Sequence, residues 1–179
     1  MKFDIKYDTK QLTAIAKQWK KNPYVKVGIL SGKDDARQEA NWNSKKSKYT
    51  LKKKSQDKIT NTEIAFAHEF GFRGRYRRLP ERSFLRMPIQ DDFQTVFQQY
   101  AVSPEAKDDF IYKPNKFLKV VGELALQVID DAFANGGSSK KKWDDLSDWA
   151  KSTKKVDQIL VETGQLRDSI SYEIVNGGK

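Results

Sequence analysis

The sequence predicts an α+β domain in which a small mixed or antiparallel β-sheet packs against a long central helix and long basic loops surround this core. An apolar stripe with helical spacing runs through residues 115–134. Residues 24–30 and 172–175 combine β-branched and aromatic side chains, which is typical of strands. The length of 179 residues suits one domain, spanning 1–179, with a real hydrophobic core.

Short apolar patterns and turn signals organise the first 32 residues. Phe3, Ile5 and Tyr7 alternate with polar residues, which predicts a short strand. Asp8 is placed to cap a following helix, and the Asn-Pro pair at residues 22–23 would end that helix. The strand predicted at 24–30 follows directly and stops at a Ser-Gly pair.

Residues 33–58 have a different character and predict a long loop or flexible insertion. Seven lysines and one acid fall between Lys45 and Lys58, and apolar residues are sparse. Such a segment is a candidate for contact with DNA or with a partner protein. The candidate residues are Lys45, Lys46, Lys48, Lys52, Lys53 and Lys54.

The next helix has clear boundaries. Thr60 and Glu63 have the spacing of a capping box, and Gly71 is placed where a helix ends. Residues 72–88 then predict a projecting arm, because six arginines lie between Arg73 and Arg86 against one acid. The arm would contact either acidic patches on a neighbouring subunit, which we favour, or phosphates. Its candidate contact residues are Arg73, Arg75, Tyr76, Arg77, Arg78, Pro80, Arg82, Phe84 and Arg86.

The second half of the chain is predicted to be mainly helical. A helix is expected over 90–100, a polar turn at Ser103-Pro104, and the central core helix over 115–134. Residues 138–142 predict a basic linker, and Thr163 is placed to cap a short helix. The terminal Asn-Gly-Gly-Lys is typical of a hairpin turn, although no partner strand follows it.

The residues for covalent or metal chemistry are sparse. The chain has no cysteine and one histidine, which argues against a thiol nucleophile and against a zinc site. His68-Glu69 begins a zinc-protease pattern, but Phe72 stands where the second histidine is required. We expect no enzymatic activity, no cofactor and no bound metal. We also expect neither a signal peptide nor a membrane span.

Charge points instead to a binding role. There are 34 Lys and Arg residues against 24 Asp and Glu, a formal net charge of +10. This balance favours acidic partners such as nucleic acid or an acidic protein face. The charge therefore predicts, as one alternative, a small basic nucleic-acid-binding protein that uses residues 45–58 and 73–78.

Four segments in a fixed order carry a family resemblance. They are VKVGIL at 25–30, EIAFAHEFG at 63–71, LPERSFLR at 79–86, and 143–175, which contains LVETGQLRDSI. Together they resemble the tail-component, or virion-morphogenesis, proteins of tailed bacteriophages, which include neck and tail-completion proteins. The lysine-rich loop and the basic loop at 73–78 depart from the family pattern.

The resemblance implies a structural virion protein rather than an enzyme. Such proteins form homo-oligomeric rings, often hexamers, at the head–tail junction or at the top of the tail tube. Implied partners are the head-closure, or connector, and tail-tube proteins, with genomic DNA passing through the ring. The implied location is the virion, after assembly in the host cytoplasm. Arg82, Phe84 and Arg86 are expected to anchor the arm on a neighbouring subunit.

Overall fold

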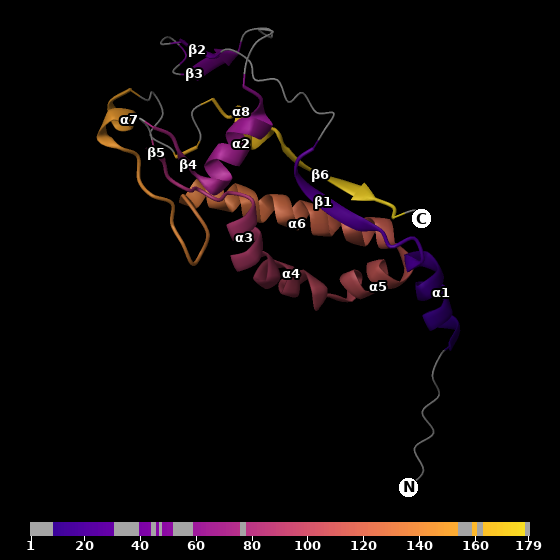
Figure 1. Cartoon of the computed structure of the whole chain (residues 1–179). Helices are drawn as coiled ribbons and strands as arrows, with labels where there is room; N and C mark the ends of the chain where they lie inside the picture. The colour runs from indigo at the N-terminus through magenta and orange to yellow at the C-terminus, as the bar shows by residue number, and fades with distance from the viewer. Residues whose placement is uncertain are drawn as a thin grey trace.

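A long helix, α6 (Pro114–Asn135), forms the centre of the fold in a computed structural model of the chain (Figure 1). The antiparallel ribbon of β1 (Tyr24–Ile29) and β6 (Ile170–Val175) packs on it. The α+β prediction, with a small antiparallel sheet on a long helix, is confirmed. The structure describes residues 9–30, 40–43, 46, 48–51, 59–75, 78–153, 159–160 and 163–177.

The remaining elements flank this centre. In Figure 1, α3 (Arg86–Asp91), α4 (Phe93–Ala101) and α5 (Pro104–Tyr112) follow α6 on the side away from the β-ribbon. Helix α1 (Thr9–Trp19) packs on α5. At the other end lie α2 (Asn61–Phe70), β4 (Phe72–Arg73), β5 (Arg78–Leu79), α7 (Asp148–Thr153) and α8 (Gln165–Asp168).

The two strands of the ribbon come from opposite ends of the chain. Tyr24 pairs with Val175 and Ile29 with Ile170, in antiparallel register. The sequence showed no partner strand after the predicted strand at 172–175. In the structure that strand belongs to β6, and its partner is β1, which precedes it in the chain. Gly122 of α6 lets the ribbon approach closely, because a Cβ there would run into the Tyr172 ring, 2.6 Å from its Cγ.

The main core lies where α6, α2 and α8 meet. Phe84 and Phe133 are fully buried, with ring centroids 5.3 Å apart. Trp143 meets Phe133 edge-on at 5.8 Å, and Leu166 of α8 completes this core. Burying each of these large side chains stabilises the fold by about 1.5–3 kcal/mol before the loss of entropy.

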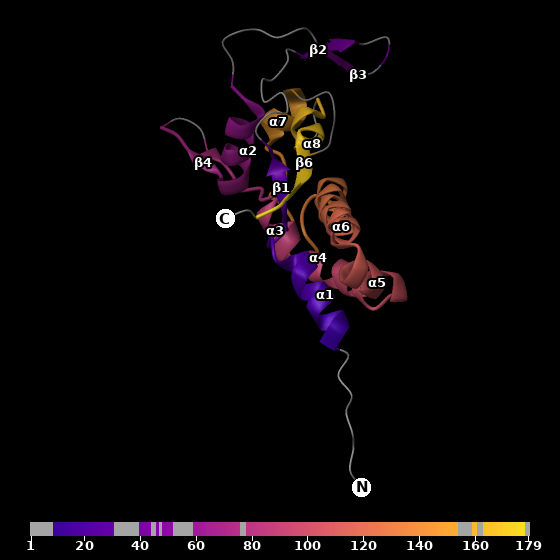
Figure 2. The ribbon, with the colours of Figure 1, turned by 90° about the vertical axis from the view of Figure 1, so that its right-hand side faces the viewer.

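A second, aromatic cluster holds the far end of α6. Phe117 of α6 contacts Phe110 of α5 at 5.3 Å and Phe97 of α4 at 6.2 Å. Trp19 of α1 packs on Phe110 at 4.9 Å and donates an indole hydrogen bond to its carbonyl oxygen at 3.1 Å. These contacts fix α1 as an extension beyond the start of β1 (Figure 2).

Two helix ends are well defined in the structure. The predicted capping box is present, with the Thr60 hydroxyl accepting from the Glu63 N–H and the Glu63 carboxylate accepting from the Thr60 N–H. Gly136 ends α6 in the left-handed conformation, with φ of 67°. None of the helices in the described part of the chain has the length and apolar character that a membrane span requires.

Other local predictions are wrong in detail. The helix expected over 90–100 is two helices, α3 and α4. The turn expected at Ser103-Pro104 begins α5, because the Ser103 hydroxyl caps it by accepting from the Ala106 N–H. Residues 138–142, for which a basic linker was predicted, connect α6 to the following segment by a turn next to α3, in which buried Ser138 donates to the Asp91 carboxylate at 2.6 Å; this does not contradict the prediction.

The predicted loop at 33–58 contains a β-hairpin. Strand β2 (Ala40–Asn43) pairs with β3 (Lys48–Leu51) in antiparallel register. The rest of that segment, apart from residue 46, lies outside the described residues, as does the strand predicted at 3–7.

Candidate functional site

The first part of the site is a buried carboxylate at the end of α2. Glu69 accepts a hydrogen bond from the Ser83 hydroxyl at 2.6 Å. It also accepts from the backbone N–H groups of Phe84, Leu85 and Arg86 at 2.9, 3.1 and 2.9 Å. These N–H groups open α3 and have no partner within that helix. Glu69 therefore satisfies the start of α3 and fixes residues 83–86 against α2.

A glycine lets the chain return close to α2. Gly71 has φ of 71°, in the region that favours glycine, and a Cβ there would lie 3.0 Å from the Leu79 oxygen and the Glu81 nitrogen. Just beyond, the Arg82 N–H donates to the His68 carbonyl oxygen at 2.7 Å. The β4–β5 hairpin thus leaves α2 and comes back beside it.

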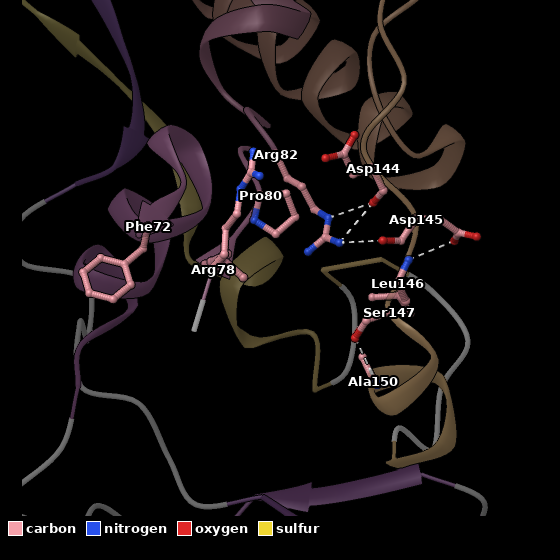
Figure 3. A pocket seen from close by; sticks show the side chains of 10 residues that line it. Phe72, Arg78, Pro80, Arg82, Asp144, Asp145, Leu146, Ser147 and Ala150 are labelled. Carbon is pink, nitrogen blue, oxygen red and sulfur yellow. Dashed lines mark hydrogen bonds between the residues drawn. The ribbon is translucent and has the colours of Figure 1, made fainter. Parts of the chain in front are cut away.

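The Arg82 side chain is the second part of the site (Figure 3). Only 6% of the residue is exposed. Its Nε and Nη2 donate to the Asp144 carbonyl oxygen at 3.1 and 3.0 Å, and Nη2 also donates to the Asp145 carbonyl oxygen at 3.1 Å. Burial lowers the pKa of Arg82, while the carboxylates of Asp144 and Asp145 act in the opposite direction. The guanidinium fork therefore joins two segments of one chain.

Two members of the predicted arm are consequently not partner contacts. Phe84, which is 0% exposed, packs in the main core, and Arg82 is bound to backbone carbonyls. The Trp143 indole closes the same junction by donating to the Ser83 carbonyl oxygen at 3.1 Å. The expectation that Arg82 and Phe84 anchor the arm on a neighbouring subunit is corrected, because their binding groups are used within the chain.

The other arm candidates lie nearer the surface. Arg73, Arg75 and Arg78 are exposed on the β4–β5 hairpin, which projects from the body in Figure 2. Arg86 is 44% exposed and pairs with Glu81 at 2.7 Å. Pro80 is half-buried. Tyr76 and Arg77 lie outside the described residues, as do Lys45, Lys52, Lys53 and Lys54, and only Lys46 of the candidate lysines has a described, exposed side chain.

An open pocket of about 800 Å³ separates the hairpin from the segment before α7 (Figure 3). Its apolar wall comes from Leu79, Pro80, Leu146 and Ala150. At its rim the Asp145 carboxylate accepts from Lys151 at 2.7 Å and from the Leu146 N–H at 2.9 Å, and these bonds lower the pKa of Asp145. The pocket thus combines an apolar wall with charged residues of both signs, among them Arg78 and Asp145.

Sequence reasoning missed an aromatic surface on α2. Phe66 and Phe70 are 67% and 57% exposed, and their ring centroids lie 4.9 Å apart. Phe72 of the hairpin is exposed nearby in sequence. The signal was available, because Phe66 and Phe70 have i, i+4 spacing and so share one side of the helix, which differs from the side of the buried Asn61, Ala65 and Glu69. Exposed neighbouring aromatics mark binding surfaces more often than isolated ones do.

The buried charged groups of the site are engaged in hydrogen bonds within the chain. Within the ranges that the structure describes, there is no group of three or more His, Cys, Asp or Glu side chains placed to hold a metal ion. The buried polar groups Glu69 and Arg82 are taken up by structural hydrogen bonds. What the site offers a partner is the exposed arginine hairpin, the α2 aromatics and the open pocket.

Comparison with protein-family models, with curated proteins and with solved structures found no match to this chain.

Proposed function

We propose that this protein is a structural virion protein of a tailed phage, a neck or tail-completion protein. In this role it forms a ring, six-membered by the family resemblance, at the head–tail junction or at the top of the tail tube. The ring joins head and tail by contacting head-closure and tail-tube proteins. The ordered sequence segments described above motivate the proposal, and the packing of those same segments supports it.

The observation that carries the proposal is that all four segments meet in one core. Val27 comes from the first segment, Ala65 from the second, Phe84 from the third, and Trp143 and Leu166 from the last. Glu69, Gly71 and Arg82 lock the second and third segments together. Segments that share one core must fit one another in packing. The occurrence of all four in one core therefore supports a fold in common with the phage family over a chance similarity of each segment.

Ring assembly requires two different surfaces on each subunit that close by rotation. The projecting hairpin with Arg73, Arg75 and Arg78 provides one surface. The α2 aromatics, Phe66 and Phe70, add apolar contact area beside it. Arginine and aromatic residues are enriched at protein interfaces, which favours a neighbouring subunit as the hairpin's first partner.

Native mass spectrometry and negative-stain microscopy test the proposal, with the purified chain alone and with tail-tube protein. We expect rings, and we expect the double substitution Arg73→Glu and Arg78→Glu to prevent them by reversing the hairpin charge. Lys107→Glu with Lys113→Glu is the matched control, because these exposed lysines lie around α5, away from the hairpin. A chain that stays monomeric with tail-tube protein, together with a gene deletion that still yields joined heads and tails, contradicts the proposal.

Nucleic-acid binding is the second candidate, because the charge of +10 and the exposed hairpin arginines suit phosphates. It predicts DNA binding at micromolar or lower concentration with a steep dependence on salt. The hairpin double variant should lower the salt slope by roughly two, one for each lost phosphate contact. Absence of binding at low salt removes this candidate and leaves ring formation unaffected.

A further inference from the structure

The β-ribbon has two strands and therefore two outer edges, one of which is formed by β1. Strand β1 is paired with β6 on one side only, and its described residues make no backbone hydrogen bond on the other side. In an antiparallel pair, every second residue directs its N–H and C=O away from the partner. The free edge of β1 is therefore a row of donors and acceptors on which another strand can pair.

An apolar groove runs beside this edge. It has a volume of about 640 Å³ and lies between β1, α2, α3 and α6. Val25 and Val27 of β1 line one side, and Phe70, Leu85, Ile89 and Val121 line the others. A strand added to β1 would lie about 4.8 Å from it and would point every second side chain into this groove.

The printed sequence contains a segment that matches both features. Phe3, Ile5 and Tyr7 are apolar and alternate with Asp4 and Lys6. A five-residue strand spans about 17 Å, which fits along the six-residue β1. This segment lies outside the described residues.

Charge and side-chain alternation together select the alignment. Lys26 is exposed on the solvent face of β1, between the groove-lining Val25 and Val27. If Asp4 pairs with Lys26, these opposite charges become cross-strand neighbours. Phe3 and Ile5 then lie next to Val25 and Val27, whether the added strand runs parallel or antiparallel to β1.

The course of α1 favours a second copy as the source. Residues 3–7 join the chain at Thr9, the start of α1. Figures 1 and 2 show that this end of α1 points away from the sheet and from α2 and α3. The helix has 11 residues and is about 16 Å long, and it leads from the start of β1 away from the groove.

We propose that residues 3–7 of one copy add as a third strand to the free edge of β1 of the next copy, with Phe3 and Ile5 in the apolar groove. The contact is heterologous, since a segment of one copy meets a groove of another, and it can therefore close a ring. This inference rests on the ring assembly proposed above and assigns one of its interfaces.

Cross-linking tests the contact directly, because the chain has no cysteine of its own. Two single variants of the full chain, Asp4→Cys and Lys26→Cys, are mixed and mildly oxidised, and we expect mixed-disulfide dimers. Glu173→Cys replaces Lys26→Cys in the control, because Glu173 is exposed on β6 directly across from Lys26. It lies a further strand away from the added segment, beyond the reach of a disulfide. Equal cross-linking of both pairs, or none, overturns the proposal.

A second measurement uses full-length Ile5→Asp, which places a charge in the groove. We expect its assembly to require at least about tenfold higher protein concentration, with an unchanged circular dichroism spectrum. Lys6→Asp is the control on the solvent face and should assemble as the parent chain does. A peptide of residues 1–8 should compete with assembly of the parent chain.

The outcomes separate this contact from the ring itself. Rings that persist in Ile5→Asp, with no Asp4–Lys26 cross-link, overturn the strand contact and leave the ring standing. A monomer at every concentration, with or without tail-tube protein, removes the ring as well. A disulfide formed within single chains of the double variant Asp4→Cys/Lys26→Cys assigns the segment to its own groove and overturns the second-copy contact.

Discussion

The carboxylate of Glu69 and the hydroxyl of Ser83 lie 2.6 Å apart and connect the end of α2 to the start of α3. Ser83 uses its oxygen twice, since it donates to Glu69 and accepts from the Met87 N–H at 3.0 Å. The pair therefore caps a short helix from two directions. It also holds the returning strand of the hairpin, so the position of the exposed arginines depends on a buried polar contact.

Glu69→Ala should lower the free energy of unfolding by about 3 kcal/mol, because four donors lose their shared acceptor in a buried place. Chemical denaturation monitored by circular dichroism measures this loss. Glu123→Ala is the matched control, since that carboxylate is exposed on α6 and should change the same quantity by less than about 0.5 kcal/mol. Equal effects of the two substitutions would show that the hydrogen bonds to Glu69 contribute little to the free energy of unfolding.

Arg82→Lys should lower the free energy of unfolding by about 2 kcal/mol, although the charge is kept. A lysine ammonium cannot reproduce the fork that reaches the carbonyl oxygens of both Asp144 and Asp145. Arg78→Lys at an exposed hairpin position is the control and should be nearly neutral. Hydrogen exchange around Asp144 and Asp145 should rise in Arg82→Lys alone, and unchanged exchange there would refute the role of the fork.

The buried position of Arg82 marks the limit of what the sequence predicts. The core helix α6, the Thr60 capping box and strand β1 follow from spacing and turn chemistry within a few residues. An arginine-rich segment, by contrast, is usually exposed, and nothing local indicates that Arg82 meets carbonyl groups 62 positions away. The pairing of β1 with β6 could not be predicted for the same reason. Which distant strands pair depends on how the whole core packs, and neither strand's own sequence specifies its partner.

Gly122→Ala should destabilise the protein, although alanine is normally favoured by up to about 1 kcal/mol over glycine inside a helix. The added methyl group would lie 2.6 Å from Cγ of Tyr172, so the β-ribbon must move away from α6. We expect a net loss of about 1–2 kcal/mol in the free energy of unfolding. Thermal and chemical denaturation measure it.

The double variant Gly122→Ala/Tyr172→Leu tests the cause of that loss. Leucine removes the ring that the methyl group meets, so the cost of Gly122→Ala should shrink in this background. Ala134→Gly, at an exposed position near the end of the same helix, reports the ordinary helix preference and should cost less than about 1 kcal/mol. A Gly122→Ala protein that gains stability would contradict the close contact between α6 and β6.

A buried carboxylate on α5 should make stability fall at alkaline pH. Asp109, only 3% exposed, accepts from the Lys116 ammonium at 2.7 Å, and this hydrogen bond raises the pKa of Lys116. Burial, followed by the charge of Asp109, raises the pKa of Tyr100. Groups whose pKa is raised on folding contribute stability that is fully present below their unfolded values, here 10.5 and 10.0, and lost as pH rises through the folded values.

Asp109→Asn should therefore lower stability at neutral pH and flatten its decline above pH about 10, because the charge that favours both protonated groups is gone. Chemical denaturation at a series of pH values from about 8 to 11.5 measures the two slopes. Asp108→Asn is the control, since its exposed neighbour on the same helix should leave the slope unchanged. Parallel pH profiles for the parent chain and Asp109→Asn would show that Asp109 does not set the protonation of Lys116 and Tyr100.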